Sequence, residues 1–144
     1  MSRIIKESAV ILKTFDFSES SLIAVTLTAE HGKIRVLAKG ARRGRSPFQG
    51  VLRTGNIAEI VYYDKGGEGL RTLREAAAEY SFDTAGAELD RVCILQAGIE
   101  IVDRTSPERG ADEGVFSVLE GFVRNIRAAR DPWLLLFWLE GGIL

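Results

Sequence analysis

The hydrophobic periodicity of this 144-residue chain changes once, near Ser81. Before this point, short apolar segments alternate with polar residues at a period of about two and are separated by turn residues, which is typical of a small all-β barrel or sandwich. After it, apolar residues recur every three or four positions, which indicates amphipathic helices. We therefore expect a β + α chain, with a β-domain at residues 1–80 and an all-α helical domain at residues 81–144.

Five segments of the first half have the composition and spacing of strands. They lie at residues 9–14, 22–28, 33–39, 57–63 and 72–80. Five is the number of strands in an OB-fold, so we expect a five-stranded OB-fold barrel. Gly32 lies between the second and third strands, and because glycine adopts positive φ at little steric cost, these two strands are predicted to form a hairpin.

Three helices are predicted in the second half, at about 84–104, at about 112–129 and from Asp131 onward. Asp131 is a favourable N-cap, and Pro132 follows it at the first helical position. The first helix is expected to bury a stripe made of Leu89, Val92, Cys93, Gln96, Ile99 and Val102. The corresponding stripe of the second helix is Val115, Phe116, Leu119, Phe122, Val123 and Ile126. Both stripes have the spacing of a helix face that packs on a core.

The third helix is almost entirely apolar over residues 133–139, and Gly-Gly-Ile-Leu follows it. Since a natural C-terminus is usually polar, we expect the helical domain to be incomplete at residue 144. The apolar run is too short to span a bilayer, and no apolar segment of signal-peptide length stands at the N-terminus. A cytoplasmic protein is therefore expected.

The chain has one cysteine and one histidine, Cys93 and His31. A single cysteine excludes an intrachain disulfide or a cysteine-based metal cluster, and its apolar neighbours favour a buried structural thiol. His31 stands in a turn without a second ligand nearby, so we interpret it as a turn residue and not as a metal ligand or catalytic base. Because no catalytic constellation or cofactor fingerprint is present, we expect neither an enzyme nor a bound metal or cofactor.

Basic residues are segregated in one segment, residues 31–58, which holds seven of them and no Asp or Glu. They are Lys33, Arg35, Lys39, Arg42, Arg43, Arg45 and Arg53. The whole chain has a formal net charge of -1, but residues 1–80 carry 13 Lys and Arg against nine Asp and Glu, whereas residues 81–144 carry six against 11. A local positive surface of this kind suits a polyanion, and nucleic acid is the first candidate.

Strand alternation within this segment sets Ile34, Val36 and Ala38 towards the core and the residues between them outward. The strand leads into a loop at residues 40–48 that contains three arginines. Arginine donates to phosphate, and an aromatic ring can stack on a base. The predicted nucleic-acid-binding residues are therefore Lys33, Arg35, Lys39, Arg42, Arg43, Arg45 and Phe48. The alternative is a basic face that only keeps the barrel solvated.

Several motifs resemble those of the RecO family of bacterial recombination mediators and repair proteins. In this chain they read Ala9-Val10-Ile11-Leu12-Lys13-Thr14, Asp16-Phe17-Ser18-Glu19-Ser20, His31-Gly32-Lys33 and Ala38-Lys39-Gly40-Ala41-Arg42-Arg43, with Ser46 and Phe48 following. The similarity continues through Tyr62-Tyr63 into the helical segment. The resemblance implies an OB-fold on a helical domain, binding of single-stranded and double-stranded DNA, and annealing of complementary strands. It also implies RecR, the single-stranded-DNA-binding protein and, indirectly, RecA as partners, at the nucleoid.

Two departures from the family pattern limit this carry-over. Many members hold a four-cysteine zinc module in a longer helical domain, whereas this chain has only Cys93, so no bound zinc is expected here. Pro47 stands where a basic or polar residue is common, and it stiffens the loop. Two other functions stay open on the residues alone: a protein-interaction scaffold that uses the acidic helical half, and an RNA-binding OB-fold.

Overall fold

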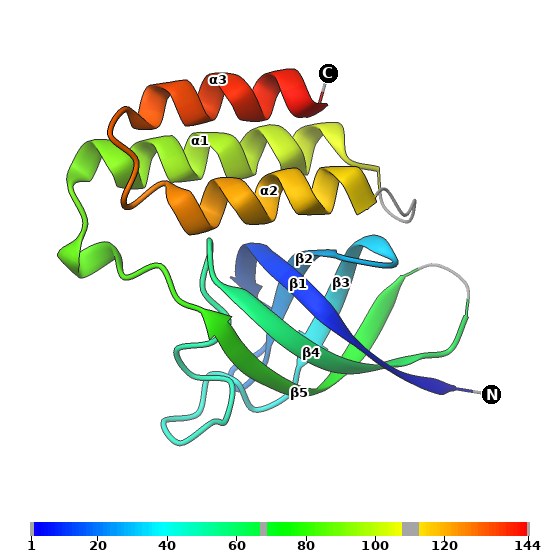
Figure 1. Cartoon of the computed structure of the whole chain (residues 1–144). Coiled ribbons are helices and arrows are strands. Elements are labelled where there is room, and N and C mark those ends of the chain that lie inside the picture. Colours follow the sequence, from blue (N-terminus) through cyan, green and yellow to red (C-terminus); the bar gives the residue numbers. More distant parts are fainter. Residues whose placement is uncertain (1, 67–68, 108–112, 144) are drawn as a thin grey trace.

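The computed structural model describes residues 2–66, 69–107 and 113–143. A β-barrel forms one layer, and three helices lie together on one side of it (Figure 1). The strands are β1 (Arg3–Asp16), β2 (Leu22–Thr28), β3 (Gly32–Ala38), β4 (Ile57–Asp64) and β5 (Leu70–Tyr80). A 3₁₀ turn η1 (Thr84–Gly86) leads to α1 (Leu89–Thr105), α2 (Glu113–Asn125) and α3 (Pro132–Ile143). The β + α class predicted from the change in periodicity is confirmed.

The five strands close into a barrel in the order β1-β2-β3-β5-β4. All neighbouring pairs are antiparallel except β3 and β5, which are parallel. This is the Greek-key strand order of an OB-fold, as predicted. The β2–β3 hairpin is also confirmed, and Gly32, which follows its turn as the first residue of β3, has a φ of 70°.

β1 is longer than the predicted strand because it closes the barrel by pairing on both sides. Residues 3–10 pair with β4, and residues 9–16 pair with β2. The register with β2 shifts between Ile11 and Lys13. The first half of β1 contains a buried charged residue, Glu7, which interrupts the apolar alternation that the prediction used. A charge that is satisfied inside a fold leaves no hydrophobic signal in the sequence.

Two apolar clusters share the barrel strands. The barrel core fills the interior and consists of Ala9, Ile11, Ala24, Ile34, Val36, Ala38, Ala41, Phe48, Leu52, Ala58, Ile60, Tyr62 and Leu73. The helix-side core joins the outer face of the barrel to the helices, and barrel residues in it include Leu12, Val25 and Leu27. β2 is therefore buried on both faces, which explains its nearly continuous apolar sequence.

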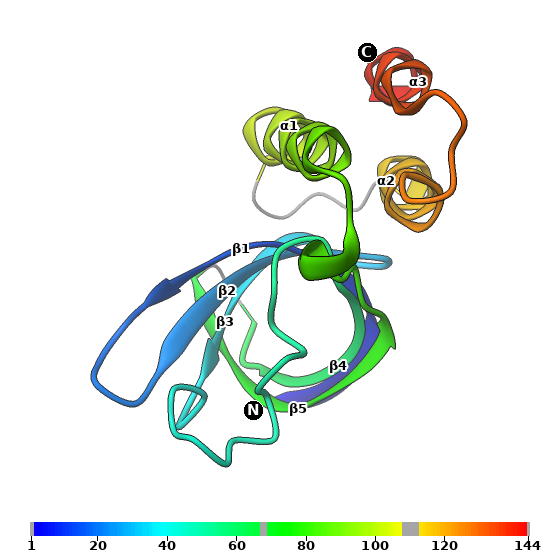
Figure 2. The ribbon, with the colours of Figure 1, turned by 90° about the vertical axis from the view of Figure 1, so that its left-hand side faces the viewer.

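The helices form a second layer in which α1 and α2 lie next to the barrel and α3 lies beyond them, as the end-on view shows (Figure 2). Asp131 accepts a hydrogen bond from the Trp133 amide at 3.1 Å, and α3 begins at Pro132, so the predicted start of this helix is confirmed. Of the helices in the described ranges, none combines the length and the hydropathy needed to cross a membrane.

The predicted buried stripe of α2 is largely confirmed, since Phe116, Leu119, Phe122 and Val123 are buried. Ile126 is also buried, although the helix ends at Asn125 and not at 129. The expected start at residue 112 lies outside the described residues.

The predicted stripe of α1 is wrong in part. The helix begins at Leu89 and not at 84, and its buried residues are Ile94, Leu95, Gly98, Ile99 and Val102. Cys93 is exposed, so the expectation of a buried thiol is corrected. The reason is Gly98. Glycine adds little to an apolar pattern, yet here it lets the Phe122 ring and Leu139 approach α1 so closely that this face becomes the packed one.

Candidate nucleic-acid interface

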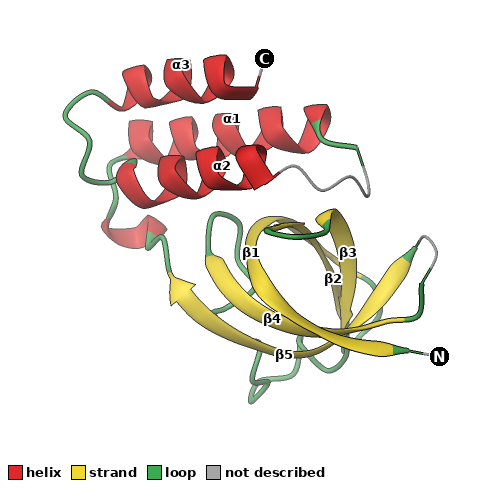
Figure 3. Cartoon of the chain, turned by 45° about the vertical axis from the view of Figure 1, so that its right-hand side comes forward, coloured by secondary structure: helices red, strands yellow, loops and turns green. Residues whose placement is uncertain are grey.

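The basic loop is the connection between β3 and β4, residues 39–56, and much of it extends from the barrel on the side away from the helices (Figure 3). Gly40 and Gly50 adopt φ angles of 74° and 79°, which allow the chain to turn there. Asn56 organises the far end of the loop, because its side-chain amide donates to the carbonyl oxygens of Gly50 and Val51 and its Oδ1 accepts from the Phe82 amide. The loop is thus a hydrogen-bonded structure without a helix.

Arg42 attaches this loop to the β1–β2 turn. Its amide donates to the Ser20 carbonyl oxygen at 3.0 Å, and its guanidinium donates to the Ser18 carbonyl oxygen. The same guanidinium forms an ion pair with Asp16 at 3.3 Å. The structure therefore brings together two segments that the sequence separates by about twenty residues. The charge of Arg42 is partly neutralised by the Asp16 carboxylate.

Besides Arg42, three of the predicted residues lie on this loop with exposed side chains: Lys39, Arg43 and Arg45. Within residues 2–66, 69–107 and 113–143, none of these three cations makes a side-chain hydrogen bond or an ion pair. Cations that lack a protein counter-charge are available to neutralise phosphates, which releases the counterions condensed on the nucleic acid. The exposure of Lys39, Arg43 and Arg45 is consistent with the positive surface expected from the sequence.

Lys33 has a different environment from the one expected. Its Nζ lies 2.9 Å from Asp103 Oδ1 on α1, and its side chain is only 14% exposed. Lys13, on β1, contacts the other oxygen of the same carboxylate at 3.0 Å. Burial alone would raise the pKa of Asp103, but the hydrogen bonds and charges of Lys33 and Lys13 outweigh it and hold this pKa below its ordinary value. Lys33 thus joins the barrel to the helices.

Arg35 is exposed on the outer face of β3, as the alternation predicted. It helps to line a cleft of about 240 Å³ between the outer strands and α1. The other lining residues are Lys13, Phe15, Val25, Lys33 and Asp103. The outer face of strands 2 and 3 is where OB-folds bind oligonucleotides, so this cleft lies on the ligand-binding side of the fold.

Phe48 does not point towards solvent. It is 7% exposed and packs in the barrel core beside Ala41 and Leu52, where it helps to cover one end of the barrel. The expectation that its ring offers a platform for a base is therefore corrected: an OB-fold whose β3–β4 connection has no helix needs apolar side chains from that connection to close its core.

Two exposed aromatic rings outside the predicted set lie near the basic loop. Phe15 and Phe17 are 43% and 58% exposed at the end of β1 and in the β1–β2 turn. Two signals could have found them: Phe15 follows Lys13 at the alternate position of a strand, and Phe17 is a large apolar residue within an otherwise polar turn. Lys13 stands before the basic segment, so the charge pattern does not single it out.

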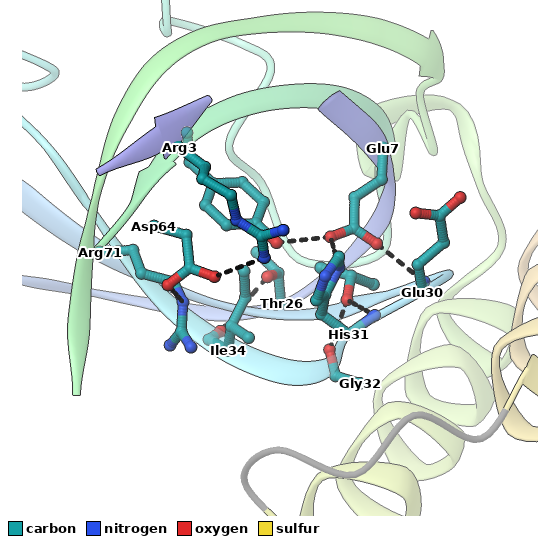
Figure 4. A network of polar contacts seen from close by, with 11 residues as sticks. Arg3, Glu7, Thr26, Glu30, His31, Gly32, Ile34, Asp64 and Arg71 are labelled. Atoms are coloured by element: carbon teal, nitrogen blue, oxygen red, sulfur yellow. Dashed lines mark hydrogen bonds and ion pairs between the residues drawn. The ribbon is translucent and has the colours of Figure 1, made fainter. Parts of the chain in front are cut away.

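A polar network closes the barrel near the β2–β3 turn (Figure 4). Glu7 is buried, and its Oε1 accepts a hydrogen bond from the Glu30 amide at 2.7 Å. Its Oε2 accepts from the Tyr62 hydroxyl and lies 2.8 Å from Nδ1 of His31. Burial, followed by the adjacent Glu7 carboxylate, raises the pKa of Tyr62 above its ordinary value of 10.0, so this hydroxyl stays a donor.

The same network contains the one group of potential metal ligands in the part of the chain that the structure describes, formed by Glu7, Glu30 and His31. Both oxygens of Glu7 are already occupied by amide, hydroxyl and imidazole partners. These hydrogen bonds connect β1, β4 and the β2–β3 turn, so the group has a structural role. His31 lies in the turn between β2 and β3, as its sequence position predicts.

The chain is similar in sequence to a known protein family. Residues 1–82 match the family described as recombination protein O, N terminal. A DNA repair protein RecO from Rhodopirellula baltica is 42% identical over 139 residues, which cover 88% of this chain and 50% of that relative. The RecO of Salinibacter ruber is 32% identical over 126 residues, covering 88% of this chain and 48% of its own length. The chain thus spans about half the length of the curated relatives it matches.

Proposed function

Since the chain belongs to the recombination protein O family, whose curated relatives are named DNA repair proteins, we propose that it binds single-stranded and double-stranded DNA without sequence preference and anneals complementary strands in recombinational repair. The resemblance drawn from the sequence motifs is confirmed by this membership. The proposal has one main structural support, the exposed cations Lys39, Arg43 and Arg45 without a protein counter-charge in the described chain.

The chemistry of such a surface is that of phosphate binding. Lysine and arginine side chains that contact phosphates fix the position of a strand and read no sequence. Arg35 on the outer face of β3 lies along the direction in which an OB-fold binds a strand. The three loop cations offer three positive charges to the phosphate backbone. Counterion release then supplies most of the binding free energy.

Annealing follows from the same charges. Two complementary strands repel each other through their phosphates, and a positive surface that holds one or both of them lowers this repulsion. The bases stay available for pairing because the protein contacts are made to the backbone. We include RecR, the single-stranded-DNA-binding protein and, indirectly, RecA among the partners of this proposal, on family membership alone. In this role the protein works at the nucleoid, in the cytoplasm.

The decisive experiment is fluorescence anisotropy of a labelled mixed-sequence single strand, titrated with the chain at several salt concentrations. If about three phosphates are neutralised, the slope of log affinity against log salt is roughly -2. The double variant Arg43→Glu/Arg45→Glu should lose affinity for every sequence tested. Sequence-tolerant binding with a shallow slope, or an unchanged affinity in the double variant, would contradict the assignment of this surface.

A scaffold function is the second candidate, and the apolar surface of α3 favours it. Trp133, Leu134, Phe137 and Trp138 are all exposed on this helix. Absence of DNA binding even at low salt would favour this candidate. Competition between DNA and RNA oligonucleotides of one sequence separates the DNA-binding function from an RNA-binding one, because phosphates are common to both polymers.

A further inference from the structure

Two exposed phenylalanines, Phe15 and Phe17, stand beside the basic loop. An exposed phenylalanine is ordinary by itself, because folded proteins always leave some apolar surface in water. These two rings differ from scattered ones in their position: Phe17 lies in the turn that Arg42 ties to the basic loop, and Phe15 lines the cleft that also contains Arg35. Each ring is therefore carried by a segment that lies next to an arginine of the predicted interface.

The turn that carries Phe17 is held in a fixed conformation. The amides of Phe17 and Ser18 both donate to the Ser21 carbonyl oxygen, at 3.0 Å and 3.2 Å. The Ser18 hydroxyl in turn accepts from the Ser21 amide at 3.2 Å. Arg42 adds contacts to Ser18 and Asp16 from outside the turn. An aromatic ring on such a pre-organised turn binds a ligand with little loss of conformational entropy.

The position of Phe15 follows from the strand register. Phe15 pairs with Ile23 and Ile23 pairs with Leu37, so these three side chains share one face of the sheet. The next row on the same face is Lys13, Val25 and Arg35. Since Lys13, Phe15 and Arg35 line the cleft beside α1, this is the outer face of the barrel. An apolar row thus lies directly beside a row that holds Arg35 and Lys13, the latter paired with Asp103.

This juxtaposition of rings and cations matches the requirements of unpaired nucleic acid. Cations follow the phosphates, and aromatic rings stack on successive bases regardless of their identity. A duplex offers the phosphates but hides the faces of its bases within the stack. We propose that Phe15 and Phe17 form a stacking platform for unpaired bases, which makes this surface prefer single-stranded over double-stranded DNA. The inference rests on the proposed function, and it adds the preference and the residues that produce it.

The test compares three labelled probes of equal phosphate number: a short oligothymidine strand, the same strand with abasic sites throughout, and a duplex. The variants are Phe15→Ala and Phe17→Ala. Ile4→Ala is the matched control, because Ile4 is 56% exposed at the opposite end of the same strand. We expect each phenylalanine variant to bind oligothymidine about five- to a hundredfold more weakly, the range that corresponds to the loss of one stacked base.

The salt dependence separates stacking from charge. In both phenylalanine variants the slope of log affinity against log salt should stay that of the wild type, because no phosphate contact is removed. Binding to the abasic strand and to the duplex should also be unchanged, and Phe17→Trp should retain binding to oligothymidine. Since both rings are exposed, thermal unfolding curves of the variants should match the wild type.

The outcomes distinguish this inference from the function on which it rests. If the wild type binds none of the three probes at low salt, both fail. If the wild type binds the abasic strand as tightly as oligothymidine, or if Phe17→Ala and Phe15→Ala bind oligothymidine as the wild type does, the platform is refuted while DNA binding stands. Equal losses in the Ile4→Ala control would refute the platform as well.

Discussion

The ammonium group of Lys33 lies 2.9 Å from Oδ1 of Asp103 and donates a second hydrogen bond, 2.8 Å long, to the carbonyl oxygen of the same residue. Lys33 belongs to β3 and Asp103 to α1, so this contact joins the barrel to the helices. Both side chains are 14% exposed. A residue whose sequence position indicates phosphate binding therefore has a structural partner within its own chain.

Neutralising Lys33 should lower the stability of the fold, whereas neutralising Arg43 should weaken the salt dependence of DNA binding. Lys33→Met leaves a largely buried carboxylate with one cation fewer, so we expect it to lower the free energy of unfolding by about 1–3 kcal/mol. Its salt slope for DNA binding should stay close to that of the wild type. Arg43→Met should leave stability unchanged and reduce the slope by about 0.7. Urea denaturation and anisotropy measure the two effects, and an equal loss of slope in both variants would contradict the assignment.

Asp103 should make the stability of the chain depend on pH in the acid range. The pKa of its carboxyl group is lower in the folded state than its ordinary value of 3.8. The stabilisation by Lys33 and Lys13 is therefore complete above that ordinary value and is lost as the pH falls through the lower, folded-state pKa. Urea denaturation at a series of pH values should show a steeper acid loss for the wild type than for Asp103→Asn. Parallel curves would show that this carboxylate does not contribute.

Tyr62→Phe tests the polar network at the end of the barrel. The variant removes the hydroxyl that donates to the buried Glu7 carboxylate and leaves the ring in place. We expect a loss of about 1–3 kcal/mol in the free energy of unfolding, because a buried charged acceptor loses a partner. Tyr63→Phe is the matched control, since this neighbouring side chain is only half-buried. Chemical denaturation of both variants is the measurement, and equal stabilities would argue against the network.

Gly98→Ala tests the close approach of the helices. A Cβ at this position would lie 2.5 Å from the Phe122 ring and 2.8 Å from Leu139 Cδ2. Despite the better helix propensity of alanine, we expect the variant to be destabilised by about 1–3 kcal/mol through overpacking. At Gly121 of α2, the nearest atom to an added Cβ is 3.9 Å away on Trp138, so Gly121→Ala should be neutral or stabilising. Thermal unfolding compares the two, and a stable Gly98→Ala variant would refute the tight contact.

Local sequence signals predict the structure correctly where the environment of a residue depends on its immediate neighbours in the chain. The alternation of Ile34, Val36 and Ala38 identified the inward face of β3, because strand geometry alone sets that period. Asp131 and Pro132 marked the start of α3, since capping involves only the first turn of a helix. The basic segment and the motifs of the family were also present in the order of the residues.

The tertiary structure decided which of these residues are exposed to solvent and can contact a ligand. Lys33 faces Asp103 and Phe48 faces the barrel core because segments distant in sequence supply a carboxylate and a cavity to be filled. Cys93 is exposed because Gly98 draws a different face of α1 against α2 and α3. Sequence by itself determined the fold class, the family and the charge of the surface. Which cations and rings face solvent followed only from the packing of strands and helices, since burial depends on what lies opposite each side chain.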